Sequence, residues 1–395
     1  MRRLLYICNA LDDETRLQRG IHTDSPAASR KILATCAALR NAGVRATVLS
    51  TGRGRADSSW RYFPAAVRRV QGMPVIYMPF THVRIVSELI SLFALAWFAF
   101  KLNRRKGEKT FLFYNRTVAY TATIMVAALL HVRRVLDLED GYIRPPRWTP
   151  AWGLTCLKAW LFDGLSNGGV LLANSALGQQ TALQPRLCFY GVADDADIAA
   201  QPRDWRSGRI NLLLGGTVAE DTGAKGLIEA IERLRDDAVI WGEKLTFFIS
   251  GKGDCIDAFR RLEGGRSGPQ VHVMGRLTDD EYDRLLQRCH VGLALKQNRG
   301  ALADTTFPSK VVEMAGAGLL VVTTRISDVD KVLRDGAIYV ESDDSGALLD
   351  ALRQVAEAPV RAEQIAEIGT AEVARLCDVR EAGRTLAEFL FPAPR

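Results

Sequence analysis

Residues 271–324 read VHVMGRLTDDEYDRLLQRCHVGLALKQNRGALADTTFPSKVVEMAGAGLLVVTT. This stretch predicts a strand, a helix, a second strand, a long polar loop, a short helix and a third strand. Its apolar runs at 291–295 and 319–322 are short, rich in Val and Leu and flanked by glycine, as strands buried in a parallel sheet are. Strands that alternate with helices predict an α/β domain built on a parallel sheet.

The polar loop of this stretch leads into a helix that gathers polar groups. Pro308 suits the first turn of a helix, where its missing N–H would have no partner, and Thr306 is the expected cap. Ser309 and Glu313 are four residues apart and share a helix face beside Lys310. Free N–H groups and a lysine suit an anion, and a fixed carboxylate suits the hydroxyls of a sugar or ribose.

Three motifs in this stretch follow one another in a known order. They are G-x-L-x-x-x-E-Y from Gly275, F-P-S-K-x-x-E from Phe307 and V-V-T-T at 321–324. In this order they resemble the donor-binding domain of the family 4 glycosyltransferases, which have the GT-B fold. That family usually carries Glu-x7-Glu here. Glu313 matches the second glutamate, on the ribose side, and Thr305 stands in place of the first, so Thr305 is a candidate catalytic residue on the sugar side.

The resemblance implies two Rossmann-like, doubly wound parallel-sheet domains facing a cleft, with a C-terminal helix that crosses back onto the first. It also implies a retaining transfer of sugar from a nucleotide sugar to a glycan or lipid-linked acceptor, in polysaccharide or glycoconjugate biosynthesis such as that of lipopolysaccharide or capsule. The nucleotide sugar is then a substrate, and neither a cofactor nor a metal is expected. Within this layout we expect a first domain at 1–192, a linker at 193–208, a donor domain at 209–372 and a returning helix at 373–395.

A glycine-rich turn follows the first strand expected in the donor domain, with the text Gly215-Gly216-Thr217. The family usually has an arginine at the position of Gly216 and a lysine at that of Thr222, both directed at the diphosphate. Lys225, one turn later, is either a phosphate ligand or a solvated lysine at a helix start. The turn has neither dinucleotide-binding nor P-loop spacing. The candidate donor-binding residues, including those after the next strand and in the short helix, are Gly216, Thr217, Lys225, Lys252, Ser309, Lys310 and Glu313.

The first half opens with a strand at 4–8, a polar loop at 9–25, a helix at 26–41 and a strand at 44–50. This order predicts a right-handed βαβ unit. A polar, arginine-rich surface loop is expected at 51–72.

Acidic residues follow a further strand expected at 132–138. Glu139 and Asp140 come directly after its apolar run, and the carboxyl ends of parallel strands face the crevice in which open α/β sheets bind ligands. The family often has a histidine at the position of Glu139, beside the donor sugar, so Glu139 and Asp140 are candidate catalytic residues. The alternative is that these acids cap the next turn or pair with Arg144 or Arg147.

An apolar helix is expected at 85–100, too short and too interrupted to span a bilayer. It is either buried against the sheet or lies at a membrane interface with its basic end on lipid phosphates. In the second case the segment 85–106 is a peripheral membrane contact. The basic residues that follow the apolar run are Lys101, Arg104, Arg105 and Lys106.

The charge of the chain is uneven between its two halves. Residues 1–200 hold 26 Lys and Arg against 14 Asp and Glu, whereas the remainder holds 26 against 31. This asymmetry favours two domains with different partners, and the basic half suits an anionic membrane, a pyrophosphate-bearing acceptor or nucleic acid. The length of 395 residues and the hydrophobic content of 48% fit two globular domains.

The cysteines and histidines do not form a metal-binding pattern. None of the seven cysteines makes a Cys-x-x-Cys pair, and the five histidines share no metal-ligand spacing. We therefore expect a reduced compartment and histidines with structural roles. The first residues show no signal-peptide pattern, so a cytoplasmic protein is expected, or one peripheral on the inner face of the membrane.

Two other functions stay open at this point. A sugar-nucleotide epimerase of the same fold would turn over without an acceptor. A basic nucleic-acid-binding protein would bind with a steep salt dependence, although the sequence has none of the motifs of known binding modules, and no nucleic-acid partner is expected. The sequence leaves the nucleotide base, the sugar and the acceptor undetermined.

Overall fold

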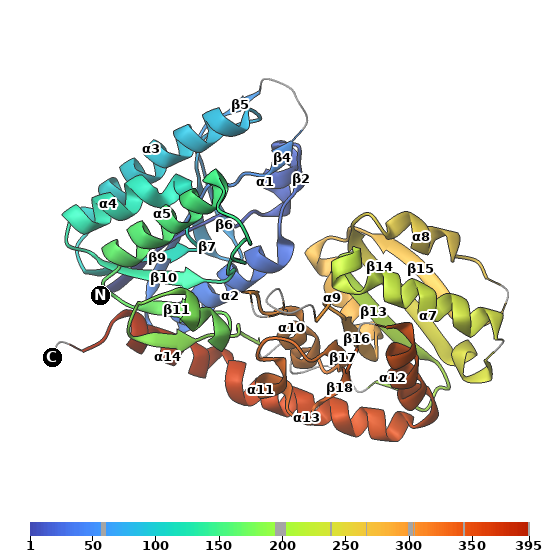
Figure 1. Ribbon diagram of the computed structural model, residues 1–395. Coiled ribbons are helices and arrows are strands. Elements are labelled where there is room, and N and C mark those ends of the chain that lie inside the picture. The colour runs from blue at the N-terminus through green and yellow to red at the C-terminus, as the bar shows by residue number, and fades with distance from the viewer. Residues whose placement is uncertain are drawn as a thin grey trace. The chain divides into compact units, whose positions relative to one another are not determined.

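The computed structural model describes residues 1–56, 61–193, 203–237, 239–265, 267–298, 303, 305–342 and 344–393. Contacts divide the chain into two compact units, drawn in Figure 1: unit 1 is Met1–Val192 with Val379–Arg395, and unit 2 is Ala193–Asp378. The division near the C-terminus lies after the expected 373, because helix α13 (Pro359–Cys377) continues beyond that residue. Most of the expected linker at 193–208 lies outside the described residues.

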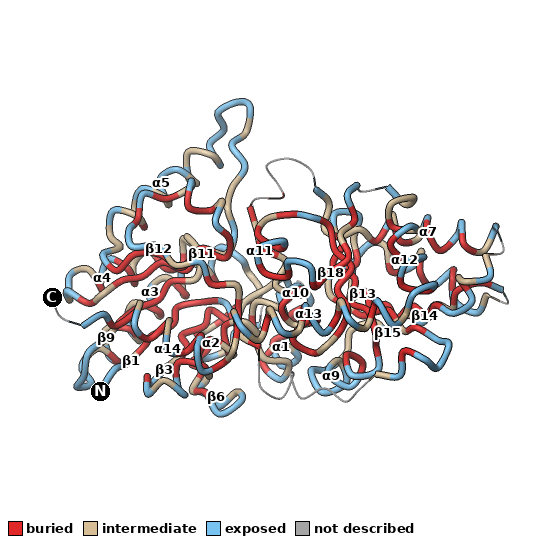
Figure 2. Tube along the Cα trace, turned by 90° about the horizontal axis from the view of Figure 1, so that it is seen from below, coloured by how far each residue is buried: buried red, intermediate tan, exposed pale blue. Residues whose placement is uncertain are grey.

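Unit 1 is built on an 8-stranded sheet in the order β12-β11-β10-β9-β1-β3-β7-β6. Every neighbouring pair is parallel except β6 and β7. The central strands are buried, as the red tube of β1 and β9 in Figure 2 shows. The strands are β1 Arg2–Cys8, β3 Arg45–Ser50, β6 Ala66–Val70, β7 Met73–Tyr77, β9 Glu108–Tyr114, β10 Arg133–Leu138, β11 Val170–Leu172 and β12 Arg186–Cys188. Two small antiparallel pairs join β2 (Ile21–Thr23) to β4 (Arg55–Ala56) and β5 (Tyr62–Phe63) to β8 (Phe80–Thr81).

The surface loop expected at 51–72 is wrong in part, because it contains the edge strand β6. Strand β6 runs antiparallel to β7, and Val70 pairs with Met73 across a two-residue turn. The turn residues Gln71 and Gly72 have φ of 48° and 76°, which suits the tight hairpin turns that match the twist of paired strands. The expected parallel sheet therefore ends in one antiparallel strand.

Helices cover both faces of this sheet (Figure 1). Helix α2 (Pro26–Asn41) begins after Ser25, whose side chain accepts a hydrogen bond from the N–H of Ala28. The loop expected at 9–25 is wrong in part, since Asp12 caps the short helix α1 (Asp13–Gln18). The opposite face carries α3 (Arg84–Asn103), the 3-10 turn η1 (Val118–Tyr120), α4 (Thr121–Leu129) and α5 (Pro150–Leu165), followed by η2 (Ser175–Gln180). Helix α5 was not expected from the sequence, although Thr149 caps it and Pro150 opens it.

The C-terminal helix α14 (Val379–Leu390) belongs to unit 1 and packs along α2. Its apolar residues Leu386 and Leu390 are fully buried in the same core cluster as Cys36 and Leu39 of α2. Gly383 lies so close to α2 that an added Cβ would come within 2.2 Å of the carbonyl oxygen of Ala38.

Unit 2 contains a 6-stranded sheet, parallel throughout, in the order β15-β14-β13-β16-β17-β18. Its strands are β13 Ile210–Thr217, β14 Leu245–Lys252, β15 Gln270–Gly275, β16 Val291–Ala294, β17 Leu320–Thr324 and β18 Ala337–Val340. Its helices are η3 Glu220–Thr222, α7 Ala224–Asp236, η4 Ile240–Lys244, α8 Ile256–Arg261, α9 Asp279–Arg288, α10 Lys310–Gly316, α11 Val329–Leu333, α12 Ser345–Glu357 and α13. The expectation of a doubly wound α/β chain with parallel sheets is confirmed.

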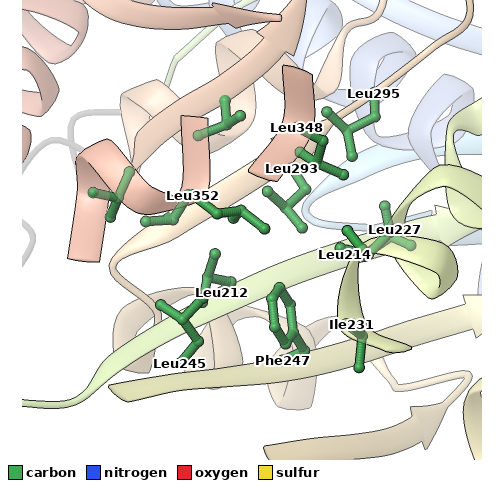
Figure 3. Packing of buried hydrophobic residues seen from close by; sticks show 14 of the residues in the cluster. Leu212, Leu214, Leu227, Ile231, Leu245, Phe247, Leu293, Leu295, Leu348 and Leu352 are labelled. Carbon is green, nitrogen blue, oxygen red and sulfur yellow. The ribbon is translucent and has the colours of Figure 1, made fainter. Parts of the chain in front are cut away.

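The two faces of this sheet hold different side chains. Leu293 of β16 points into an apolar core shared with Phe247, α7 and α12, and Figure 3 shows how these side chains pack. The neighbouring Gly292 faces the other way, where an added Cβ would meet the sulfur of Met314 at 2.4 Å. Helix α10 therefore lies directly on the sheet, and this close packing holds Lys310 and Glu313 at the edge of unit 2.

Candidate functional site

The side chain of Lys310 lies against the glycines that end β13. An added Cβ on Gly216 would lie 2.4 Å from Nζ of Lys310 and 2.7 Å from its Cε, and one on Gly215 would lie 3.2 Å from Nζ. Gly216 also has φ of 98°, which favours glycine. At the position where an arginine was expected, glycine thus leaves room for a cation that comes from α10 instead.

Tyr282 completes this group. Its hydroxyl oxygen lies 3.5 Å from Oε2 of Glu313, and Nζ of Lys310 lies 5.8 Å from the centre of its ring. A capping box fixes the first turn of α9, since Thr278 and Glu281 satisfy each other's backbone N–H groups. We call Gly215, Gly216, Tyr282, Lys310 and Glu313 the lysine cluster. The sequence analysis included Tyr282 in the motif that begins at Gly275, but it did not name this residue as a candidate site residue.

The helix that carries Lys310 and Glu313 begins later than expected. Ser309 is its N-cap, so Pro308 and Thr306 precede the helix, and the assignment of Thr306 as the cap is wrong. The Ser309 side chain makes no capping hydrogen bond. Two consecutive buried residues, Val311 and Val312, hold the helix on the sheet and leave Lys310 and Glu313 half-buried.

The remaining donor-side candidates lie at the carboxyl edge of the same sheet. Thr217 pairs with Lys252 at the ends of β13 and β14, with Thr217 exposed and Lys252 half-buried. Lys225 is exposed on the first turn of α7. Thr305 is buried, with 7% of its surface exposed, and Asp304 lies outside the described residues. The carboxyl edge of an open parallel sheet is where such folds bind ligands.

A small pocket opens at this edge, between the start of α7 and the ends of β16, β17 and β18. Gly223 lies against Leu295, since an added Cβ would come within 2.3 Å of the Leu295 carbonyl oxygen. The N–H of Gln297 donates to the carbonyl of Asp221 at 3.0 Å, which ties the loop after β16 to the turn before α7. The pocket is lined by Gly223, Gly226, Leu295, Gln297, Thr324, Val340, Ser342, Asp344 and Leu348.

In unit 1, Glu139 forms an ion pair that the sequence did not suggest. Its Oε1 lies 2.6 Å from Nζ of Lys31 on α2, and both side chains are largely buried. Lys31 also donates to the carbonyl of Phe189 at 3.2 Å. The alternative pairing of Glu139 with Arg144 or Arg147 is therefore not what the structure shows.

Asp140 is held differently from its neighbour. Its side chain is exposed and accepts a hydrogen bond from Nδ2 of Asn115 at 2.8 Å. The Asn115 Oδ1 atom accepts from the N–H groups of Glu139 at 2.8 Å and Asp140 at 3.0 Å. Asn115 has φ of 57°, a conformation that asparagine tolerates better than most residues. This residue fixes the strand end from which both acids project.

A buried carboxyl lies behind Glu139. Asp137 is two residues earlier on β10, so the two side chains share one face of the strand. Burial, and then the nearby charge of Glu139, raise the pKa of Asp137 well above its ordinary value, against the opposing effect of Lys31. The hydroxyl of Tyr6 donates to Asp137, and burial together with these acids raises the pKa of Tyr6. We call Tyr6, Lys31, Asp137 and Glu139 the acid cluster.

Within the part of the chain that the structure describes, no group of three or more His, Cys, Asp and Glu side chains is arranged to hold a metal ion. One histidine has a clear structural role. His290 accepts a hydrogen bond from the N–H of Asn211 at 3.0 Å, and its other ring nitrogen lies 3.3 Å from the carbonyl oxygen of Asp204.

Comparisons with known proteins agree with this layout. Residues 209–358 match the family model "Glycosyl transferases group 1". WcaI of Escherichia coli, named as a colanic acid biosynthesis glycosyl transferase, is 29% identical over 174 residues, which are 42% of this chain and 40% of WcaI. The chitobiosyldiphosphodolichol beta-mannosyltransferase of Dictyostelium discoideum is 29% identical over 126 residues, 31% of this chain and 25% of that protein. The chain thus matches less than half the length of either relative.

The structure is also similar over its whole length to solved structures. HepE of Anabaena in complex with UDP has a TM-score of 0.68 and 14% sequence identity, with 99% of each chain covered. At this identity the similarity concerns the fold, and the GT-B fold expected from the sequence is confirmed.

Proposed function

We propose that this protein is a glycosyltransferase that takes its sugar from a nucleotide sugar bound at the carboxyl edge of the unit 2 sheet. The observation that carries the proposal is that the segment matching the glycosyl transferase family model, residues 209–358, contains the whole lysine cluster. The cluster brings a cation and a carboxylate together at the carboxyl edge of the sheet. A small pocket opens at the same edge.

The chemistry proposed for this edge is electrostatic. Departure of a nucleoside diphosphate builds negative charge, and the ammonium group of Lys310 is the proposed group that neutralises it, with Lys225 and Lys252 as further candidates. Glu313 is the proposed partner of the ribose hydroxyls. Thr305 is the proposed residue on the sugar side in unit 2, and Glu139 and Asp140 are the catalytic candidates that unit 1 contributes to the proposal. In this proposal the transfer retains the anomeric configuration and needs no metal ion.

The acceptor is proposed to be a glycan or a lipid-linked saccharide. The excess of 26 basic over 14 acidic residues in the first 200 suits an anionic acceptor such as a pyrophosphate-linked one. Two relatives, one named for colanic acid biosynthesis and one for a diphosphodolichol-linked saccharide, support this class. A cytoplasmic location, or one at the inner face of the membrane, follows from the same proposal.

Two measurements test the proposal in order. A thermal-shift panel of UDP, GDP, ADP and their sugars should identify one base, because a ligand at 100 times its Kd adds about 2.7 kcal/mol of stability. The sugar nucleotide selected in this way should then release its diphosphate with lipid-linked saccharides, and chelator should not reduce the rate. NMR of the product gives the anomeric configuration.

Three results would contradict parts of the proposal. Turnover of the sugar nucleotide without any acceptor would favour an epimerase. Failure of every nucleotide, combined with steeply salt-dependent binding of nucleic acid, would favour the nucleic-acid-binding alternative. Loss of activity on chelation would refute only the part of the proposal that says no metal ion is needed.

A further inference from the structure

Helix α3 of unit 1 carries its largest apolar side chains on its outer side. Ile85, Leu89, Phe93 and Trp97 are four residues apart and form one stripe along the helix. Their exposed fractions are 73%, 53%, 67% and 63%. A surface helix of a soluble protein normally turns such a stripe toward the core.

The opposite stripe of α3 faces the protein, and most of its side chains are small or polar. Ser87, Ser91, Leu95 and Ala99 are buried and are also four residues apart. Among the described residues, the hydroxyl oxygens of Ser87 and Ser91 have no hydrogen-bond partner. Small residues at a helix contact with large apolar ones outside are the pattern of helices that face lipid. The sequence expectation of a buried helix therefore holds for only one side of α3.

The exposed apolar surface continues over the two neighbouring helices. Helix α4 lies beside α3, and α5 lies beside α4 (Figure 1). Met125 and Leu129 are exposed on α4, and Leu154, Leu157 and Trp160 are exposed on α5. Phe162 is the only buried residue of α5. We call the outward side of α3, α4 and α5 the outer helical face.

The carboxylates of these helices are paired, and the other charged groups at the end of α3 are basic. The three helices, all of whose residues are described, contain two carboxylates, and each is paired: Glu88 with Arg53 at 3.3 Å and Asp163 with Arg116 at 2.7 Å. The basic residues at the end of α3, all exposed, are Lys101, Arg104, Arg105 and Lys106. An apolar face with a basic border matches the interface of an anionic bilayer, in which tryptophan is also favoured.

We propose that the outer helical face docks on the surface of an anionic lipid bilayer. Helix α3 has 20 residues, longer than the 85–100 expected, and an 18-residue window of it has a mean hydropathy of 1.8. It is therefore long and apolar enough to cross a membrane by length and composition, and the expectation that it is too short is wrong. It packs on the sheet through its small stripe, however, so the proposal is that it lies in the interface with the other two helices. A second copy of the chain is a poorer occupant, because these helices offer no unpaired carboxylate to the basic border. The proposal goes beyond sugar transfer and does not depend on it.

Sedimentation with lipid vesicles tests the proposal on the full chain. The protein should pellet with vesicles of phosphatidylcholine and phosphatidylglycerol, and far less with phosphatidylcholine alone. Changing Phe93→Ser together with Trp97→Ser should reduce partitioning about 100-fold, since each loses a large buried side chain in the bound state. Changing Arg104, Arg105 and Lys106 to Ser should reduce it by a similar factor, at roughly fivefold per residue.

The control changes two other exposed apolar residues, which lie outside the face. Ile240→Ser with Ile368→Ser removes exposed isoleucines from unit 2 and should leave partitioning unchanged. Because every substituted side chain is exposed, circular dichroism should show that all variants fold. Absence of vesicle binding by the wild type, or equal binding by the Phe93/Trp97 variant, would overturn the proposal. A stable wild-type dimer that the Phe93/Trp97 substitutions abolish, with no vesicle binding by either protein, would also overturn the proposal.

A native cysteine provides an independent probe of insertion. Cys156 is exposed on α5, and Cys188 is exposed outside the three helices. In a Cys188→Ser background, an environment-sensitive dye on Cys156 should brighten and shift to the blue when anionic vesicles are added. The same dye on Cys188, in a Cys156→Ser background, should not respond. An unchanged signal at Cys156 would show that α5 is not part of the docked surface.

Discussion

The ammonium group of Lys310 occupies space that only a glycine at position 216 leaves open. Gly216→Ala places a methyl group 2.4 Å from Nζ, so Lys310 must move away from the end of β13. If Lys310 neutralises a diphosphate, we expect the affinity for nucleoside diphosphate to fall about tenfold, while that for the free nucleoside barely changes. Isothermal titration calorimetry with both ligands measures this difference.

Gly275→Ala is the control for backbone strain. Gly275 has φ of 64°, yet nothing lies within 4 Å of an added Cβ. Both variants should lose about 1 kcal/mol of stability from the positive φ, and only Gly216→Ala should lose diphosphate affinity. Equal affinities in the two variants would mean that the position of Lys310 does not matter for binding.

The carboxylate of Glu313, the proposed partner of the ribose hydroxyls, lies close to the hydroxyl of Tyr282. We expect Glu313→Ala to weaken nucleotide binding by about 1.5–3 kcal/mol, the scale of hydrogen bonds to a charged group. Tyr282→Phe removes the hydroxyl group that lies 3.5 Å from Oε2 of Glu313 and should leave affinity nearly unchanged. Titration of both variants with the nucleotide found by thermal shift measures the two affinities. A Glu313→Ala variant that binds the nucleotide as tightly as the wild type would show that Glu313 is not a ligand of the nucleotide.

Asp137 makes stability depend on pH in a direction opposite to that of most carboxylates. Burial raises its pKa in the folded protein well above the 3.8 of the free group. The folded state therefore binds the proton more tightly than the unfolded state does. The contribution of Asp137 to stability is fully present below the pKa of the unfolded group and is lost as pH rises through the raised pKa.

Asp137→Asn removes the titration while keeping an acceptor for the hydroxyl of Tyr6. Relative to the wild type, the variant should gain stability with rising pH from about 3.8 upward, by at most about 1.4 kcal/mol per pH unit. Thermal melts of both proteins at each pH measure this difference. A difference that stays constant with pH would show that Asp137 does not hold a proton.

At the scale of elements, one arginine ties two helix ends together in unit 2. Arg203 donates hydrogen bonds to the carbonyls of Leu286 and Cys289 at the end of α9, and of Ala317 and Gly318 after α10. A guanidinium is favourable at helix C-termini, where carbonyl groups lack partners. We expect Arg203→Ala to destabilise unit 2 by about 3 kcal/mol. Arg203→Lys should recover only part of the loss, because one ammonium group cannot satisfy four carbonyls.

Calorimetric melting of the three proteins checks this prediction. If Arg203→Ala melts like the wild type, these hydrogen bonds are replaced by water at no cost.

The elements that sequence patterns could predict are those with strong periodicity. Helix α2 begins and ends at the residues expected, because Ser25, Pro26 and the apolar spacing define it. Helix α5 was missed because it buries only Phe162, so it lacks the apolar stripe by which helices are recognised. Strand β6 was missed because its pairing depends on the two-residue turn at Gln71 and Gly72 rather than on a hydrophobic run.

Some contacts of the candidate site could likewise be predicted from the sequence, and others could not. Lys310 and Glu313 could be placed together from the sequence, because three residues along one helix are neighbours. The approach of Lys310 to Gly216 and the pairing of Lys31 with Glu139 could not, since residues far apart in the chain meet only through the packing of whole elements. Asp137 could be placed in the strand expected at 132–138, but its contact with the hydroxyl of Tyr6 on β1 could not be predicted.

At the scale of the whole molecule, the chain leaves unit 1 at Val192 and returns to it at Val379. The return is held by α14, whose buried Leu386 and Leu390 belong to the core of unit 1. Unit 1 therefore cannot finish folding until α14 has been made, whereas unit 2 is one continuous segment.

Gly383 allows α14 to lie in close contact with α2. The substitution Gly383→Ala therefore tests how α14 packs on unit 1. An added Cβ would lie 2.2 Å from the carbonyl oxygen of Ala38 and 2.8 Å from its carbon, both backbone atoms that cannot turn aside. The two helices must separate, and we expect unit 1 to lose about 1–3 kcal/mol. Gly164→Ala is the matched control, because nothing lies within 4 Å of its added Cβ, and it should gain up to about 1 kcal/mol from the lower flexibility of alanine. Hydrogen exchange should show faster exchange in α2 and α14 of Gly383→Ala, with the strands of unit 2 unchanged. If exchange instead rose equally in both units, the C-terminal helix would not be a part of unit 1 alone.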